Sequence, residues 1–172
     1  MLRLVLVASL LTGCHTSPPP AADAPPPPVD ASPPPDAPVV RTCTDSTAVS
    51  CMAAVAHSDL AWIETNIFAT SCAFSGCHDS VTDVGKLDLR TGMSHNDLVG
   101  VSSVIDPTRK LVVPNDIHAS YLMLSLHDFP PEMATPPGVA PGVGYMPLGA
   151  PTLCCQKLEA IERWIMAGAP AN

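Results

Sequence analysis

The chain has 172 residues, roughly the length of one domain, and a formal net charge of −8 from 16 acidic and 8 basic residues. This acidic balance argues against nucleic-acid binding, because a phosphate-binding surface needs clustered Lys and Arg. It equally argues against attachment to anionic lipid by charge. No apolar run reaches the roughly 18 residues of a membrane-spanning helix. Seven cysteines in so short a chain are typical of an exported protein.

The first thirteen residues have the pattern of an export signal, with Arg3 followed by an apolar stretch from Leu4 to Leu11. The next residues, Thr12-Gly13-Cys14, complete a sequence that resembles the lipobox of bacterial lipoproteins. The resemblance implies that residues 1–13 are removed and that Cys14 is lipidated. It implies a lipid anchor in the cell envelope, and His15, which is not acidic, favours the outer membrane facing the periplasm. The alternative is an ordinary cleaved signal with Cys14 unmodified.

Residues 14–42 form a Pro-rich linker after the signal. Eleven of the 21 prolines lie between Pro18 and Pro38, and residues 17–40 consist of Pro, Ala, Asp, Val and Ser alone. Such a stretch cannot bury a core and favours an extended polyproline II chain, which at about 3.1 Å per residue reaches on the order of 70 Å. We therefore expect a disordered spacer that holds a domain away from the lipid. A Pro-rich ligand for a recognition module is the alternative.

Three stretches of the remaining 130 residues, 43–172, carry apolar side chains at helical spacing. Their ranges and candidate caps are Asp59–Ser71 (Ser58 or Asp59), Ile117–His127 (Asn115 or Asp116) and Cys154–Ala167 (Thr152 at the start, Gly168 at the end). No segment shows sustained strand alternation; a short extended piece is expected at residues 101–105 or 111–113. The fold class is therefore all-α with long Gly/Pro-rich loops. Seven aromatic residues provide little core, so disulfides, a metal or a large apolar cofactor should complete the interior.

The end of the first predicted helix runs into Cys72-Ala73-Phe74-Ser75-Gly76-Cys77-His78. Two cysteines followed at once by histidine is the arrangement that attaches c-type haem. The two thiols form thioethers with the vinyl groups of one porphyrin edge, and the adjacent imidazole reaches the iron. Four residues separate the cysteines instead of the usual two, so the loop must bulge, and Gly76 is suited to absorb the bulge.

Further motifs follow in a fixed order over about 100 residues. They are Ile67-Phe68, Leu87-Asp88-Leu89, Leu98-Val99-Gly100-Val101, Val113-Pro114, Ala119-Ser120-Tyr121-Leu122, Met146-Pro147-Leu148-Gly149, Trp164-Ile165 and Ala167-Gly168-Ala169-Pro170. With the cysteine motif, they resemble the cytochrome c-like domains of exported bacterial proteins that have a Cys-x₄-Cys-His site. The resemblance implies one covalent haem c and first and third helices that cross. Cys72 and Cys77 would hold the haem, His78 would be the proximal iron ligand and Met146 the distal ligand.

Other interpretations of these residues remain open. Cys72 and Cys77 form a disulfide in one of them, with His78 a solvated neighbour. In another, Cys72, Cys77, His78 and a further thiol hold zinc. Met146 in a third is an ordinary loop residue. The rival distal ligands are Met93, Met133, His95, His118 and His127.

Four cysteines remain after Cys14, Cys72 and Cys77 are set aside, and the even number favours disulfides. One pattern joins Cys43 and Cys51 to Cys154 and Cys155, which ties the start of the domain to the third helix. Each bond then closes a loop of about 100 residues and stabilises the fold by roughly 4–5 kcal/mol. The other pattern joins Cys43 to Cys51 locally. A bond between the adjacent Cys154 and Cys155 is strained.

The most economical function is electron transfer by a membrane-anchored, mono-haem cytochrome-like protein that is not an enzyme. Residues 43–172 contain 13 acidic and 6 basic residues, so a redox partner with a basic surface is expected. The main alternative is a haem-free, disulfide-stapled envelope lipoprotein that acts as a binding or structural module. A third interpretation is a peroxidase-like enzyme with an open distal site.

Overall fold

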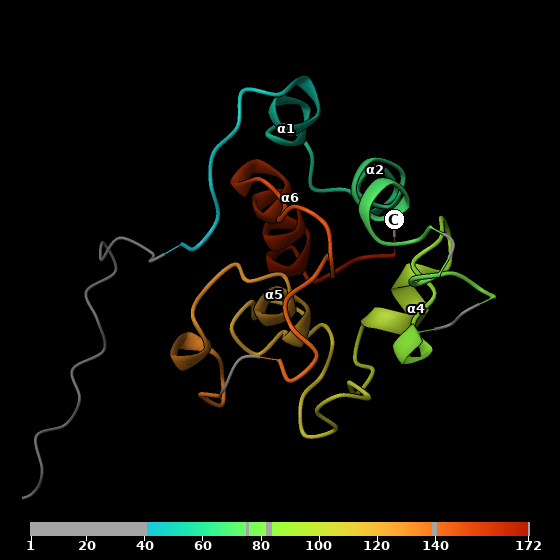
Figure 1. The fold of residues 1–172 in the computed structure, drawn as a ribbon, viewed down its shortest axis with the longest axis vertical. Coiled ribbons are helices and arrows are strands. Elements are labelled where there is room, and N and C mark those ends of the chain that lie inside the picture. Colours follow the sequence, from blue (N-terminus) through green and yellow to red (C-terminus); the bar gives the residue numbers. More distant parts are fainter. Residues whose placement is uncertain (1–40, 75, 82–83, 139–140, 172) are drawn as a thin grey trace, which may run out of the picture. The chain divides into compact units, whose positions relative to one another are not determined.

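The computed structural model describes residues 41–74, 76–81, 84–138 and 141–171 (Figure 1). The described residues all belong to one compact unit, residues 38–172. The predicted signal peptide, Cys14 and almost all of the Pro-rich linker lie outside the described residues.

The described part is dominated by helices and contains no strand longer than an isolated bridge. The helices are α1 (Val49–Ala54), α2 (Leu60–Ile63), the π-helical η1 (Glu64–Phe68), α3 (Ala69–Ser71), the 3₁₀-helical η2 (Val84–Lys86), α4 (Ser94–Leu98), α5 (Tyr121–Ser125), η3 (Pro131–Met133) and α6 (Cys155–Met166). The bridges pair residues 99 with 112, 102 with 110, 110 with 120 and 113 with 116. A mostly helical fold is thus confirmed, and the expected extended pieces are single bridges only. None of the described helices has the length and apolarity needed to cross a membrane.

The first predicted helix is confirmed as the continuous run of α2, η1 and α3 over residues 60–71. Asp59 is its N-cap, and its side chain accepts a hydrogen bond of 2.9 Å from the amide of Trp62. The central five residues widen into a π-helix, which turns Glu64 inward. The buried Glu64 carboxylate accepts from the Ser94 hydroxyl at 2.6 Å and from the Gly92 amide at 2.8 Å, so it ties the start of α4 to this helix.

The third predicted helix is confirmed as α6, within one residue at each end. It buries one face, with Leu158, Ile161, Trp164 and Ile165 in the core. Its C-terminus is a Schellman motif, because Gly168 has a φ of +94° and the amide of Ala169 donates to the carbonyl of Trp164 at 3.0 Å. The predicted cap Thr152 is wrong, since Cys154 occupies the N-cap position without a side-chain hydrogen bond.

The second predicted helix is shorter than expected, because α5 covers only Tyr121–Ser125. The Ser120 hydroxyl donates to the carbonyl of Asp116 at 2.6 Å and accepts from the amide of Val113 at 2.9 Å. The Asp116 side chain accepts from the amide of Ala119 at 2.9 Å. These local bonds hold residues 116–120 in turns and compete with the helix, as Ser and Asp side chains do. The short helices α1 and α4 were not predicted.

Two disulfides join the start of the domain to α6. Cys43 is bonded to Cys155 and Cys51 to Cys154, with sequence separations of 112 and 103 residues. The crossing pattern is therefore confirmed and the local Cys43–Cys51 bond is wrong. In Figure 1, α1 and α2 lie beside α6, and the Arg163 guanidinium donates to the carbonyls of Ala54 at 2.8 Å and His57 at 2.9 Å.

Candidate haem site

The loop that carries the cysteine motif begins where α3 ends. The amides of Cys72 and Ala73 both donate to the carbonyl of Phe68 at 2.8 Å, which stops the helix. The amide of His78 donates back to the carbonyl of Cys72 at 3.1 Å and closes the loop. Gly76 adopts a φ of +91°, so glycine provides the left-handed turn that the four-residue spacing requires. The loop thus places both cysteines and the histidine on one wall of a cavity.

His78 is fixed by its own backbone and by its ring. Its carbonyl accepts from the amide of Leu89 at 2.9 Å, and its Nδ1 lies 2.9 Å from the carbonyl oxygen of Val84. A carbonyl can only accept, so Nδ1 donates, and in the neutral form of the ring the lone pair is on Nε2. A histidine that binds a metal is normally oriented in this way, by a hydrogen bond from its other nitrogen.

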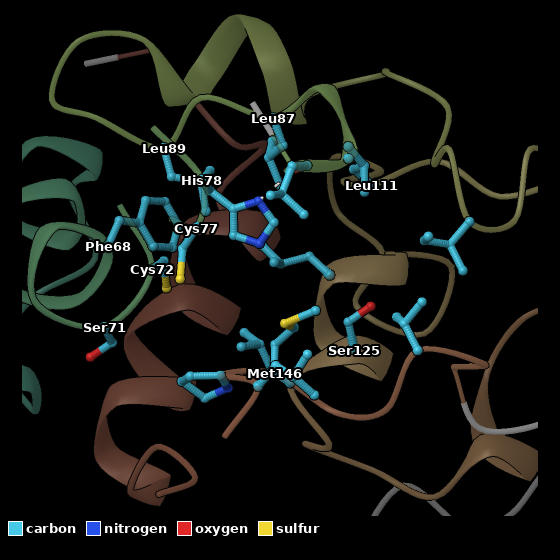
Figure 2. A pocket seen from close by; sticks show the side chains of 18 of the residues that line it. Phe68, Ser71, Cys72, Cys77, His78, Leu87, Leu89, Leu111, Ser125 and Met146 are labelled. Atoms are coloured by element: carbon cyan, nitrogen blue, oxygen red, sulfur yellow. Dashed lines mark hydrogen bonds between the residues drawn. The ribbon is translucent and has the colours of Figure 1, made fainter. Parts of the chain in front are cut away.

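Met146 lies on the opposite side of the same cavity, as Figure 2 shows. Its amide donates to the carbonyl of Ser125, the last residue of α5, at 2.7 Å. Its side chain belongs to a loop with left-handed glycines at Gly144 and Gly149, which curve the backbone around the cavity. The structure therefore brings together four of the predicted site residues: Cys72, Cys77, His78 and Met146.

The cavity has a volume of about 360 Å³, within the roughly 300–1,000 Å³ of cofactor and ligand pockets. Its walls are mainly apolar, and the principal apolar residues are Phe68, Leu87, Leu89, Leu111, Leu122, Leu126, Leu153 and Ile161. Its mouth carries exposed apolar side chains, which are Phe74, Val84, Val104, Ile105, Val143 and Leu148. Polar groups are few, with hydroxyls from Ser71, Ser103, Tyr121 and Ser125.

Cys72 and Cys77 are thiols and form no disulfide with each other. Their sulfurs lie beside one another at one edge of the cavity (Figure 2). Burial, reinforced by the neighbouring Cys77, raises the pKa of the Cys72 thiol to about 12. Cys72 is therefore a protonated thiol at neutral pH and not an activated thiolate. The described residues contain no cluster of three or more His, Cys, Asp or Glu that could hold a metal ion directly, and the disulfides leave no further thiol among them for zinc.

The five rival distal ligands do not line the cavity. His95 instead lies with Nε2 3.1 Å from the carbonyl of Ala169, His118 packs against Phe129, and His127 stacks on Tyr145. Sequence reasoning missed the two backbone carbonyls that orient the candidate ligands, at Val84 and Ser125. A backbone acceptor has no residue-type signal, so no pattern in the sequence identifies these groups.

Sequence reasoning also missed a buried ionic cluster away from the cavity. Arg41 lies 2.7 Å from Glu162 and 3.7 Å from the fully buried Asp128, whose carboxyl lies beside Glu162. Burial and the Glu162 carboxylate raise the pKa of Asp128 to about 8. The cluster fastens Arg41 to Glu159 and Glu162 of α6.

Comparison with protein-family models, with curated proteins and with solved structures gave no match. The cavity itself combines two thiols and an oriented imidazole with a thioether that faces them.

Proposed function

We propose that the chain is a lipid-anchored c-type cytochrome that carries single electrons on one covalently attached haem. One observation supports this most strongly. The Cys72 and Cys77 thiols, the His78 imidazole and the Met146 thioether line a single apolar cavity, with His78 and Met146 on opposite sides (Figure 2).

The two thiols have the chemistry that covalent attachment needs. Each S–H adds across one vinyl C=C bond: sulfur bonds to one carbon and hydrogen goes to the other, so no oxidant is consumed. The reaction requires reduced cysteines, and Cys72 and Cys77 are the thiols of the described residues while the other four cysteines are in disulfides. The partition of the cysteines therefore fits attachment at this pair.

The remaining site residues would bind and shield the cofactor. His78 would offer Nε2 to the iron because Val84 holds Nδ1, and Met146 would offer its sulfur. Bound haem would supply a reversible one-electron couple, whose potential a methionine ligand raises relative to a second histidine. The leucines and Phe68 would exclude water, and the haem would fill the part of the core that the side chains leave open.

Anchoring and partner choice belong to the same proposal. Lipidation at Cys14 and the Pro-rich linker of residues 14–42 would tether the domain at the outer membrane, on the periplasmic side. The 13 acidic and 6 basic residues of the domain favour a partner with a basic surface, because complementary charge speeds encounter.

A second candidate is the haem-free, disulfide-stapled envelope module. It is favoured by the two long-range disulfides, which stabilise the fold without any cofactor. It leaves the two thiols of the cavity without a use.

The deciding experiment is a pyridine haemochrome spectrum of the full chain, expressed with a haem-attachment system and then denatured. We expect one haem that stays with the polypeptide, and none with the Cys72→Ser/Cys77→Ser variant. Cys51→Ser/Cys154→Ser is the matched control, because it removes two other cysteines and should retain the haem. Colourless, haem-free mature protein would refute electron transfer and leave the stapled module.

A further inference from the structure

The loop that carries Met146 is fastened to the end of α5 at two consecutive residues. The Met146 amide donates to the Ser125 carbonyl at 2.7 Å. One residue earlier, the Tyr145 ring stacks on the His127 ring, with centroids 3.8 Å apart and an angle of 14° between the planes. The hydrogen bond holds the Met146 backbone beside the end of α5. The ring contact holds Tyr145, and with it the backbone that leads into Met146, beside His127. Neither His127 nor Tyr145 lines the cavity, so both act on it through Met146.

His127 occupies a left-handed backbone position, which few residues other than glycine adopt. Its φ is +58°, in the left-handed region that favours glycine or asparagine, and its amide donates to the carbonyl of Leu124 to end α5. A residue that only ended this helix would be better as glycine. What histidine adds is its ring, and the ring is placed on Tyr145. A side chain other than glycine at such a position points to a role for the contact that the side chain makes.

The His127 segment is itself held in place. The Thr42 hydroxyl donates to the His127 carbonyl, and the Thr42 amide donates to the Asp128 carbonyl at 3.3 Å. Thr42 precedes Cys43, which is bonded to α6 through Cys155. The ring of His127 thus extends from a backbone that Thr42 holds in place, whereas Tyr145 lies in a loop outside the described helices.

We infer that His127 is a positioning residue: by stacking on Tyr145 it holds the Met146 sulfur toward His78 and so keeps the distal position closed. The inference rests on the proposed function, because the place of the sulfur matters chemically only if an iron lies between the two residues. It assigns a role to a histidine that the sequence offered only as a rival ligand.

The test uses the haem-loaded full chain with four sequences: wild type, His127→Asn, His127→Phe and Tyr145→Leu. Asparagine accepts the left-handed backbone but lacks the ring, whereas phenylalanine keeps a ring for stacking. Free imidazole is titrated against each protein, and displacement of the thioether is followed by absorption. Hydrogen exchange at the Met146 amide provides a second measurement that does not depend on electron transfer.

We expect His127→Asn and Tyr145→Leu to bind imidazole about three- to tenfold more tightly than wild type, as expected for the loss of one aromatic pair. Their Met146 amides should exchange faster by a similar factor, and His127→Phe should match wild type in both measurements. If the asparagine and leucine variants also match wild type, the positioning role is overturned. If phenylalanine behaves like asparagine, stacking is not the mechanism. A chain without covalent haem would refute the proposed function itself, which the haemochrome spectrum reveals before any titration.

Discussion

The interior of the domain is complete around α6 and open at the cavity. Around α6, Trp164 and its apolar neighbours are fully buried, and both disulfides reach its first turn. At the cavity mouth, six large apolar side chains remain exposed, and Leu148 is 65% exposed. Large exposed apolar patches on folded proteins commonly mark binding sites. The contrast is what we expect if the first region stabilises the fold and the second receives the proposed cofactor.

The largest effect should come from α6. Trp164→Ala removes a fully buried indole, and it leaves the carbonyl of Pro170 without the donor it has at 2.9 Å. We expect the free energy of unfolding to fall by about 3–5 kcal/mol. Chemical denaturation of the full chain measures it. Leu148→Ala is the control at the cavity mouth and should change stability by less than about 0.5 kcal/mol. An equal fall in the free energy of unfolding for Trp164→Ala and Leu148→Ala would contradict the division into a stabilising α6 region and an open cavity mouth.

The disulfides should come next. Cys43→Ser/Cys155→Ser opens a closed segment of 112 residues and should cost about 2–5 kcal/mol, measured by the same denaturation. Cys72→Ser/Cys77→Ser in haem-free protein should cost far less, because these thiols close no loop. A larger loss of stability from Cys72→Ser/Cys77→Ser than from Cys43→Ser/Cys155→Ser would show that the disulfides to α6 are not the main stabilising cross-links.

The two regions also differ in how far the sequence predicts them. The amphipathic pattern and Gly168 predict α6 within one residue at each end. The prediction succeeds because the spacing of the apolar residues and the terminating glycine both lie within one continuous segment. The Cys72–His78 motif predicts one wall of the cavity, since its geometry is set within seven residues. The opposite wall depends on contacts between residues about 20 positions apart, Ser125 with Met146 and His127 with Tyr145. Such contacts leave no periodic signal, so the sequence predicts Met146 as a ligand only through resemblance and does not predict what holds it.

Asp128, which faces α6, should make the stability of the folded state depend on pH. Asp128 is 1% exposed, faces Arg41, Glu159 and Glu162, and has a pKa raised to about 8 by burial and by the Glu162 carboxylate. In the unfolded chain an aspartate titrates near 3.9, so between about pH 4 and 8 the folded state holds a proton that the unfolded state has lost.

Stability should therefore fall as pH rises through that window, by at most about 1.4 kcal/mol per unit from this group. Denaturation at a series of pH values measures the slope. Asp128→Asn cannot lose a proton at this position, and its slope should be shallower. An identical slope in the variant would assign the titration to another group.

The smallest effect on stability and the most informative one on function should come from Met146→Leu. Leucine has a similar volume, so the fold should lose less than about 1.5 kcal/mol. Covalent haem should remain, because Cys72 and Cys77 are untouched. If Met146 is the iron ligand, the midpoint potential measured by redox titration must fall, since the thioether that favours the reduced iron is gone. If the domain is instead a peroxidase with an open distal site, its peroxide turnover should be unaffected by the substitution. An unchanged potential would mean that Met146 lines the cavity without being an iron ligand. His78 would then remain the only one of the two proposed ligands that the experiment supports.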